Sequence, residues 1–338
     1  MAEIITADWH LTDDSRDEYR WQWLNDFIEF IKNYSETITS IKILGDITED
    51  KDNHSERLVN RITDYINTLR AYTNDIIILA GNHDGVDSER SFFRFLNNMT
   101  GVRVITEPMF IGEDFYMPHS RNFESIWNEL VTVHSFLNRP CKRMFFHQGF
   151  NGVRVSNGSI IEGINTNVFN NVNEDCNIFS GHIHVPQQLG KIIYVGSPYP
   201  IYFGDHFDGR FIIYKDDKPL LQHHLSSIHK YSLTIQDTRE LLNFNLKSGD
   251  QMSIVVKISK SKAHTWSSIE ERVRAFVNRR NVTIASLQCE LVGNDTQILV
   301  THDNRRHMTD TDLFHEFAKV NDISIGTLLT GLEIINDN

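Results

Sequence analysis

The chain has 338 residues, of which 40% are hydrophobic, and this is enough for one large domain and a small one. A formal net charge of −12 argues against a protein that binds DNA alone, because phosphate contact normally shows as excess Lys and Arg. No apolar run approaches the length of a membrane span, no signal segment precedes the first strand, and the three cysteines lack metal or redox spacing, so we expect a cytoplasmic protein without membrane contact.

The first two thirds of the chain predict alternating strands and helices. Short apolar runs predict buried strands at residues 4–7, 41–44, 76–80, 144–146 and 178–179. Apolar residues at helical spacing predict helices over 18–34 and 56–70, each with one face toward a core. Strands with interleaved helices favour sheets that are covered by helices.

A polar cluster follows each of these strands. The five clusters are Asp8-Trp9-His10, Gly45-Asp46, Gly81-Asn82-His83-Asp84, His147-Gln148-Gly149 and Gly181-His182-Ile183-His184. Because α/β sheets build their sites where strands run out into loops, we expect the clusters to meet. Asp8 and His10 are two residues apart, as are His182 and His184, so in extended backbone both members of a pair can face one ion. Carboxylate, imidazole and amide ligands suit manganese or iron, and two such ions hydrolyse phosphate esters.

A further motif lies shortly after the last cluster. It reads Tyr194-Val195-Gly196-Ser197-Pro198 and then Phe203-Gly204-Asp205. With the five clusters, it resembles the SbcD nuclease family of the calcineurin-like metallophosphoesterase superfamily, including the shorter versions carried by large phages. The resemblance is clear over residues 1–215 and fainter beyond. It implies an α/β fold, a calcineurin-like two-sheet β-sandwich flanked by helices, with a small α+β capping domain and C-terminal helices.

The resemblance also implies roles for the clustered side chains around two divalent metal ions, usually manganese. The implied ligands are Asp8, His10 and His184 for the first ion, Asn82, His147 and His182 for the second, and Asp46 as a bridge between them. His83 would bind no metal but would contact the phosphate and help to protonate the leaving oxygen. Asp84 would orient His83, as a carboxylate commonly does for a working imidazole.

One departure from the family pattern follows Asp46. Family members usually carry an aromatic residue two positions on, and some carry a second active-site histidine three positions on, where this chain has Thr48 and Glu49. Because the ligand set is intact, we still expect hydrolysis, although the balance between exonuclease and endonuclease action is open. His54 either substitutes for the missing histidine or is a solvated loop residue.

The pattern changes in the last third of the chain. We expect a nuclease domain at 1–225, a capping domain at 226–305 and a C-terminal helical segment at 306–338. Alternating apolar residues predict a half-buried strand at 254–258, and 297–300 predicts another. Ser267 and Glu270 predict a capping box that opens a helix.

Two features of this region have more than one interpretation. Arginines cluster on the predicted helix at positions 272, 274, 279 and 280, either for DNA contact or as a solvated face. The apolar residues of 309–336 either dock on an ATPase partner, as in the family, or pack on the capping domain.

The sequence therefore predicts a metal-dependent DNA nuclease, the catalytic subunit of a complex with an SbcC-like coiled-coil ATPase, and a homodimer. By resemblance, it would act as a 3′-to-5′ exonuclease and single-strand endonuclease on DNA ends in repair, recombination or replication, in the host cytoplasm if the chain is phage-encoded. One alternative is a solitary metallophosphodiesterase of small nucleotides, which would use the same metal site. Another is a non-catalytic scaffold with the same fold, which the complete ligand set disfavours.

Overall fold

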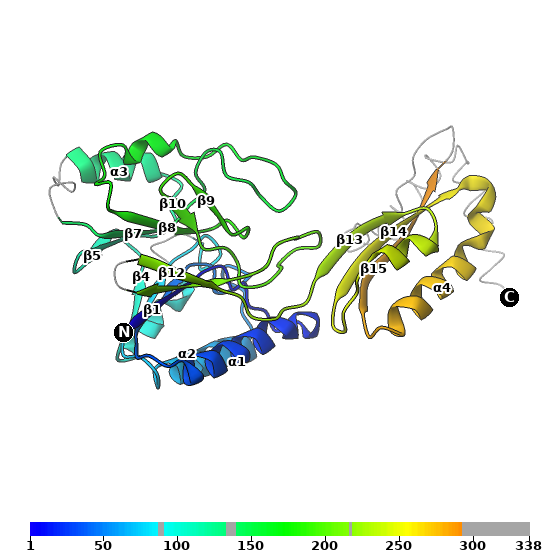
Figure 1. Cartoon of the computed structure of the whole chain (residues 1–338), viewed down its shortest axis with the longest axis horizontal. Helices are drawn as coiled ribbons and strands as arrows, with labels where there is room; N and C mark the ends of the chain where they lie inside the picture. The colour runs from blue at the N-terminus through cyan, green and yellow to red at the C-terminus, as the bar shows by residue number, and fades with distance from the viewer. Residues whose placement is uncertain (87–90, 133–139, 216–217, 293–338) are drawn as a thin grey trace, which may run out of the picture. The chain divides into compact units, whose positions relative to one another are not determined.

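The protein is described by a computed structural model that covers residues 1–86, 91–132, 140–215 and 218–292 (Figure 1). The chain divides into two compact units. The first unit comprises Met1–Ser232, Leu246–Met252 and Arg280–Thr283, and the second comprises Leu233–Asn245, Ser253–Arg279 and the residues from Ile284 onward. The expected C-terminal segment 306–338 and the expected strand 297–300 lie outside the described residues.

The first sheet of the first unit has six strands in the order β12-β11-β1-β2-β3-β4. Four neighbouring strands are parallel, namely β1 (Ala2–Thr6), β2 (Ile38–Leu44), β3 (Ile76–Leu79) and β4 (Val102–Ile105). Two more strands extend the β1 edge: β11 (Phe211–Lys215) pairs antiparallel with β1, and β12 (Lys218–His223) pairs antiparallel with β11. Thr6 lies opposite Ile43, and Leu44 lies opposite Leu79. The strands β1, β2 and β3 therefore end at nearly the same level, and the loops that follow them leave the sheet together.

The second sheet also has six strands, in the order β5-β6-β7-β8-β10-β9. Its strands are β5 (Met109–Ile111), β6 (Asp114–Met117), β7 (Arg143–His147), β8 (Asn177–Gly181), β9 (Gln187–Leu189) and β10 (Ile192–Tyr194). The four strands β6, β7, β8 and β10 are parallel, and His147 at the end of β7 lies opposite Gly181 at the end of β8. This sheet thus presents two more strand ends at one level.

Three apolar layers hold the first unit together. Helices α1 (Glu18–Asn33) and α2 (Glu56–Leu69) cover the outer face of the first sheet, and α3 (Phe123–Thr132) covers the outer face of the second (Figure 1). Between the sheets, Leu44 and Leu79 pack against Phe145 and Phe179. The expected two-sheet sandwich flanked by helices is confirmed, and both expected helices are present to within one residue.

The described part of the second unit contains most of a three-stranded sheet and one α-helix. The sheet order is β13-β14-β15, and the strands β13 (Lys230–Ile235), β14 (Gln251–Ser259) and β15 (Thr283–Val292) each start in the first unit. Helix α4 spans Trp266–Asn278 and buries Val273 and Val277. The expected capping box is wrong, because the helix begins one residue before Ser267 and its N-cap, Thr265, makes no side-chain capping bond. The strand expected at 254–258 is confirmed within β14.

Short 3-10 helices complete the described chain. They are η1 (Ser15–Asp17), η3 (Phe92–Asn98), η5 (Thr166–Phe169), η6 (Thr238–Asn243) and η7 (Lys260–Thr265). Among the helices of the described residues, none is long and apolar enough to cross a membrane.

Candidate metal centre

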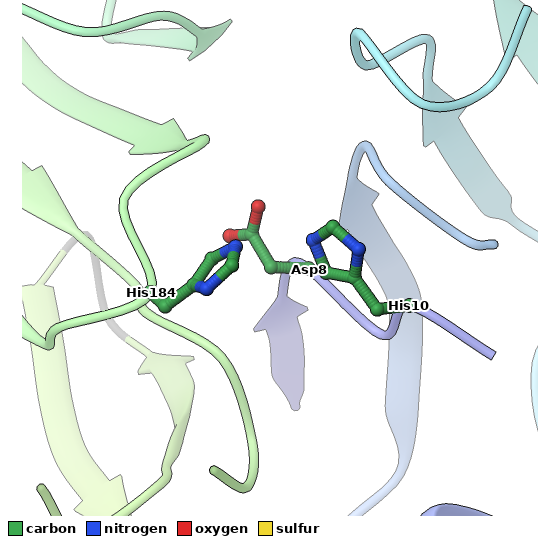
Figure 2. A group of neighbouring side chains, drawn as sticks. All are labelled: Asp8, His10 and His184. Carbon is green, nitrogen blue, oxygen red and sulfur yellow. The ribbon is translucent and has the colours of Figure 1, made fainter. Parts of the chain in front are cut away.

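The first group of candidate ligands comes from the loops after β1 and β8. Ligand atoms of Asp8, His10 and His184 lie within 4.8 Å of one another, and Figure 2 shows their side chains turned toward a common point. The Nε2 atom of His10 also lies 3.5 Å from Oδ2 of Asp46, which follows β2. The three residues expected to hold the first ion are therefore assembled, with the expected bridging carboxylate beside them.

The second group lies around the same carboxylate. Ligand atoms of Asp46, His147 and His182 lie within 4.8 Å of one another, and His147 Nε2 is 3.2 Å from Asp46 Oδ2. The Oδ1 atom of Asn82 lies 3.1 Å from His147 Nε2 and 2.7 Å from His182 Nδ1. His147 Nδ1 lies 2.7 Å from the Leu44 carbonyl oxygen, to which it donates, so Nε2 is the ring atom that faces the group and is left for a metal.

Four of these residues have left-handed backbone. The φ angles are 54° at Asp8, 46° at His10, 53° at Asp46 and 77° at His182. The expectation that extended backbone turns Asp8 and His10 the same way is wrong, because sharp turns bring them together instead. Left-handed conformation costs a non-glycine residue on the order of 1–3 kcal/mol, and such outliers gather at functional sites.

Two glycines let the loops approach this closely. A Cβ on Gly45, which has a φ of 85°, would lie 2.2 Å from His147 Nδ1. A Cβ on Gly81 would lie 2.2 Å from Asp46 Oδ1. Any side chain at either position would therefore displace a candidate ligand, which explains why glycine precedes Asp46 and Asn82.

Buried polar atoms without partners test whether metal ions fit this site. Among the described residues, Oδ2 of Asp8 and Nε2 of His10 are buried without a hydrogen bond. Leaving such atoms unpaired costs about 1–3 kcal/mol each, and a divalent cation bound by the carboxylate and an imidazole nitrogen would offset this cost. The donor set of oxygen and imidazole nitrogen thus suits two divalent ions of the manganese and iron type.

Comparison with known proteins agrees with this geometry. Residues 4–186, more than half of the chain, match the family model described as Calcineurin-like phosphoesterase. The chain belongs to this family. No curated protein sequence matches this calcineurin-like phosphoesterase.

Several solved structures are similar to parts of this phosphoesterase. They include Pseudomonas putida nuclease MPE, with 11% identity over 56% of this chain and 66% of that chain and a TM-score of 0.30. A dimetal phosphatase from Danio rerio has 10% identity over 63% of this chain and 91% of that chain, with a TM-score of 0.39. A protein of unknown function from Aquifex aeolicus has 13% identity over 50% of this chain and 91% of that chain, with a TM-score of 0.28. This chain covers less than two thirds of the length of the Pseudomonas putida nuclease.

Burial sets the charges of this phosphoesterase centre. Desolvation, reinforced by His147, lowers the pKa of His182 to about 3, and desolvation with His10 lowers the pKa of His184 well below its usual value. Both rings are therefore neutral at pH 7, which is the form that binds metal. Desolvation also raises the pKa of Asp8 to about 7, and a cation bound nearby would favour the ionised carboxylate.

Asp84 has a different role from the one expected. Its Oδ2 accepts hydrogen bonds from the backbone N–H groups of Asp46 at 2.8 Å and Gly81 at 2.7 Å, and its Oδ1 accepts one from Ile47 at 2.7 Å. The ring of His83 is instead held at Nδ1 by the Glu49 carbonyl oxygen, 2.5 Å away. Asp84 therefore fixes the loop that carries Asp46 and does not orient the His83 ring through these bonds.

We expect Asp84→Ala to lower the free energy of unfolding by about 2–4 kcal/mol, because it leaves three buried N–H groups without an acceptor. Urea unfolding in the presence of a chelator measures this loss without a contribution from bound metal. Asp64→Ala is the control, since Asp64 is exposed on α2 and its replacement should change stability by less than about 0.5 kcal/mol. Equal stabilities of the two variants would contradict the assigned role.

Glu49 is a member of the centre that sequence reasoning treated only as a departure. Its Oε2 lies 3.1 Å from His10 Nδ1, and ligand atoms of Glu49, His10 and His83 lie within 4.8 Å of one another. The guanidinium of the buried Arg20 lies 3.6 Å from the same carboxylate. A carboxylate on Nδ1 fixes the ring orientation and leaves Nε2 of His10 for a metal.

We expect Glu49→Gln to weaken binding of the first ion by about 10–100-fold, because the His10 ring loses the carboxylate that orients it. Calorimetric titration with manganese measures both affinities, and the second ion should bind as in the wild type. Glu56→Gln, in the exposed first turn of α2, is the matched control. Wild-type affinity for both ions in Glu49→Gln would show that Glu49 does not support the site.

Two other histidines have no assigned role so far, because the sequence left the role of His54 open and His119 was not singled out. His54 is not among the clustered residues; its ring packs edge-on against Phe92, with centroids 4.3 Å apart. His119, which sequence reasoning missed, stacks on His182 at 5.5 Å, and its Nδ1 lies 3.2 Å from the His147 carbonyl oxygen. The signal for His119 was available, because it follows the end of β6 as the other clusters follow their strands.

Two hollows open beside the centre, and His182 lines both. One has a volume of about 420 Å³ and is lined by His119, Arg121 and Gln148 with the first residues of α3. The other has a volume of about 370 Å³ and is lined by apolar and aromatic side chains, including Tyr202, together with polar ones such as Asn157 and Asp205. Both volumes lie within the range of small-molecule sites.

Proposed function

We propose that this phosphoesterase is a metal-dependent DNA nuclease that hydrolyses phosphodiester bonds with two divalent ions, most suitably manganese. The observation that carries the proposal is the pair of ligand groups around one carboxylate oxygen, Oδ2 of Asp46, 3.5 Å from His10 and 3.2 Å from His147. Two ions bound this way would supply the nucleophile and neutralise the charge that builds on the phosphate.

His83 is the proposed proton donor to the leaving oxygen. Its backbone N–H donates to Asp46 Oδ1 at 2.8 Å, and its ring Nδ1 is bonded to the Glu49 carbonyl oxygen. Since that oxygen can only accept, Nδ1 carries a hydrogen, and Nε2 is the atom left for the substrate, to which it would give a proton from the doubly protonated imidazolium. The ring lies beside His10, with centroids 4.8 Å apart, and so stands next to the first ligand group.

DNA is the proposed substrate because of the motif and the hollows together. The Tyr194–Pro198 and Phe203–Asp205 strings resemble those of SbcD nucleases. The two hollows that share His182 offer space for substrate groups beyond the scissile phosphate, as a nucleic acid chain has. Because the chain has a net charge of −12, most contacts to DNA phosphates would come from other parts of a complex. We propose that a coiled-coil ATPase partner and a homodimer supply them.

A solitary phosphodiesterase of small nucleotides is the second candidate. The observation that favours it is the limited volume of each hollow, about 370 Å³ and 420 Å³, which suits a single nucleotide as well as part of a strand. It would use the same ligands and the same proton donor, so the metal centre does not distinguish the two candidates.

Manganese-dependent cleavage of end-labelled duplex and single-stranded DNA by the purified chain tests the proposal. A cyclic nucleotide and bis(p-nitrophenyl) phosphate serve as parallel substrates, and each is also tested after addition of an SbcC-like coiled-coil ATPase. The expected result is that the wild type cleaves DNA and that His83→Ala cleaves it about 10²–10⁴-fold more slowly. Turnover of the small esters alone, with DNA intact even after the ATPase is added, would favour the phosphodiesterase.

A further inference from the structure

We infer that the hollow at Tyr202 receives a nucleobase of the substrate strand, next to the phosphodiester bond that is cut, and that the Tyr202 ring is the surface on which this base stacks. The inference rests on the proposed function and adds a base-binding subsite to it. The hollow adjoins the metal centre directly, because His182 and His184 form part of its wall.

Tyr202 is an exposed aromatic residue fixed against a candidate ligand. Its ring stacks on His184, with centroids 5.4 Å apart and an interplanar angle of 29°. Even so, 49% of the residue remains exposed, which places it among the exposed large hydrophobic residues of the described chain. One face of the ring is thus supported by the protein, and the remaining surface is available to a planar group.

The turn that carries Tyr202 is held rigidly. The carboxylate of Asp205, itself only 2% exposed, accepts hydrogen bonds at 2.8 Å from the backbone N–H groups of both Ile201 and Tyr202. Gly204, with a φ of 96°, donates its N–H to the Lys230 carbonyl oxygen at 2.9 Å, and Lys230 Nζ donates to the Ile201 carbonyl oxygen at 3.0 Å. A ring that is already fixed loses little entropy when it stacks on a ligand.

The chemistry of the hollow suits a base and not a phosphate. No Lys or Arg is among the described residues that line it, and Val155, Ile183 and Phe203 give it apolar walls. Ser156 and Asn157 add polar groups at the same hollow, which the hydrogen-bonding edge of a base can use. A base lies within one nucleotide of every phosphodiester bond, so a base-binding hollow beside the metal centre matches the spacing of a strand.

Position-resolved cleavage of a modified oligonucleotide tests the inference. The probe is 5′-labelled decathymidylate, either unmodified or with one abasic residue placed at each internal position in turn, cleaved with manganese by the full chain. For the wild type, we expect an effect when the abasic residue lies on one particular side of the cleaved bond. Cleavage at that bond should then fall about 5–100-fold relative to the same bond in the unmodified strand, as expected for the loss of one stacked base. In Tyr202→Ala the ratio of cleavage of the unmodified strand to cleavage of the abasic strand should be close to one, while Tyr202→Phe should keep the wild-type ratio.

The ratio compares substrates with one enzyme, so a general loss of activity in a variant cancels. Tyr231→Ala is the matched control, because Tyr231 also stacks on a histidine, His229, at 5.9 Å but does not line the hollow, and it should keep the wild-type ratio. If Tyr202→Ala is inactive, Tyr202→Leu, which keeps bulk without a ring, provides the comparison. Equal ratios in the wild type and the Tyr202 variants, or no abasic effect in the wild type, would overturn the inference. A wild type that cleaves no DNA in the assay above, even after the ATPase is added, would instead overturn the proposed function.

Discussion

Asp46→Ala is expected to abolish binding of both metal ions and to reduce phosphodiester hydrolysis to background. The reason is the position of Oδ2, which lies 3.5 Å from His10 Nε2 in one ligand group and 3.2 Å from His147 Nε2 in the other. Removing it leaves each ion without its shared carboxylate and leaves two buried imidazoles without their acidic neighbour. Metal content of the purified variant, measured by mass spectrometry, and manganese-dependent cleavage of labelled DNA check the two parts of this prediction.

Asp50→Ala is the matched control for that experiment. Asp50 follows in the same loop, is exposed, and should retain both ions and full activity when replaced. Asp46→Asn, with one oxygen left, should bind metal more weakly than the wild type. Retention of one ion at wild-type affinity in Asp46→Ala would refute a bridging role, since a bridge cannot be removed from one ion alone.

His83→Ala is expected to keep both ions and to cleave DNA about 10²–10⁴-fold more slowly, which is the usual contribution of a general acid. The loss should depend on the leaving group. Departure of a sugar oxygen requires a proton, whereas p-nitrophenolate is a stable anion. Hydrolysis of bis(p-nitrophenyl) phosphate should therefore fall much less than cleavage of DNA when the two kcat values are compared between variant and wild type.

His264→Ala, at an exposed histidine of the second unit, controls for the loss of an imidazole elsewhere. It should leave the metal content and both reactions unchanged. Loss of an ion from His83→Ala would reassign His83 as a ligand. Equal losses on the two substrates would remove its role as proton donor.

Much of the first unit could be predicted because its signals are local. Helices α1 and α2 each present an apolar face with period 3.6, and the strands before the clusters are mostly apolar. The convergence of the clusters followed from one rule about strand ends, without knowledge of which strand lies beside which. Short strands such as β5 and β9 gave no such signal, because three residues are too few to show a period.

The errors have a different physical origin. The spacing of Asp8 and His10 suggested extended backbone, but left-handed turns decide where these side chains point, and no periodicity reveals them. Asp84 bonds to backbone N–H groups that lie up to 38 positions away, and Glu49 reaches His10 across 39 positions. Contacts of this kind depend on how separate loops pack, so a motif can name the residue without disclosing its partner.

The origin of the ligands has a mechanical consequence. Asp8 and Asp46 extend from the first sheet, whereas His147 and His182 extend from the second. An ion held by residues from both sheets would cross-link the two sheets at one edge of the sandwich, as a disulfide or a zinc ion cross-links parts of smaller proteins. Folding would then be linked to metal concentration by mass action, and the melting temperature would rise as manganese is added. The ions proposed to act in catalysis would therefore also stabilise the packing of the two sheets of the first unit.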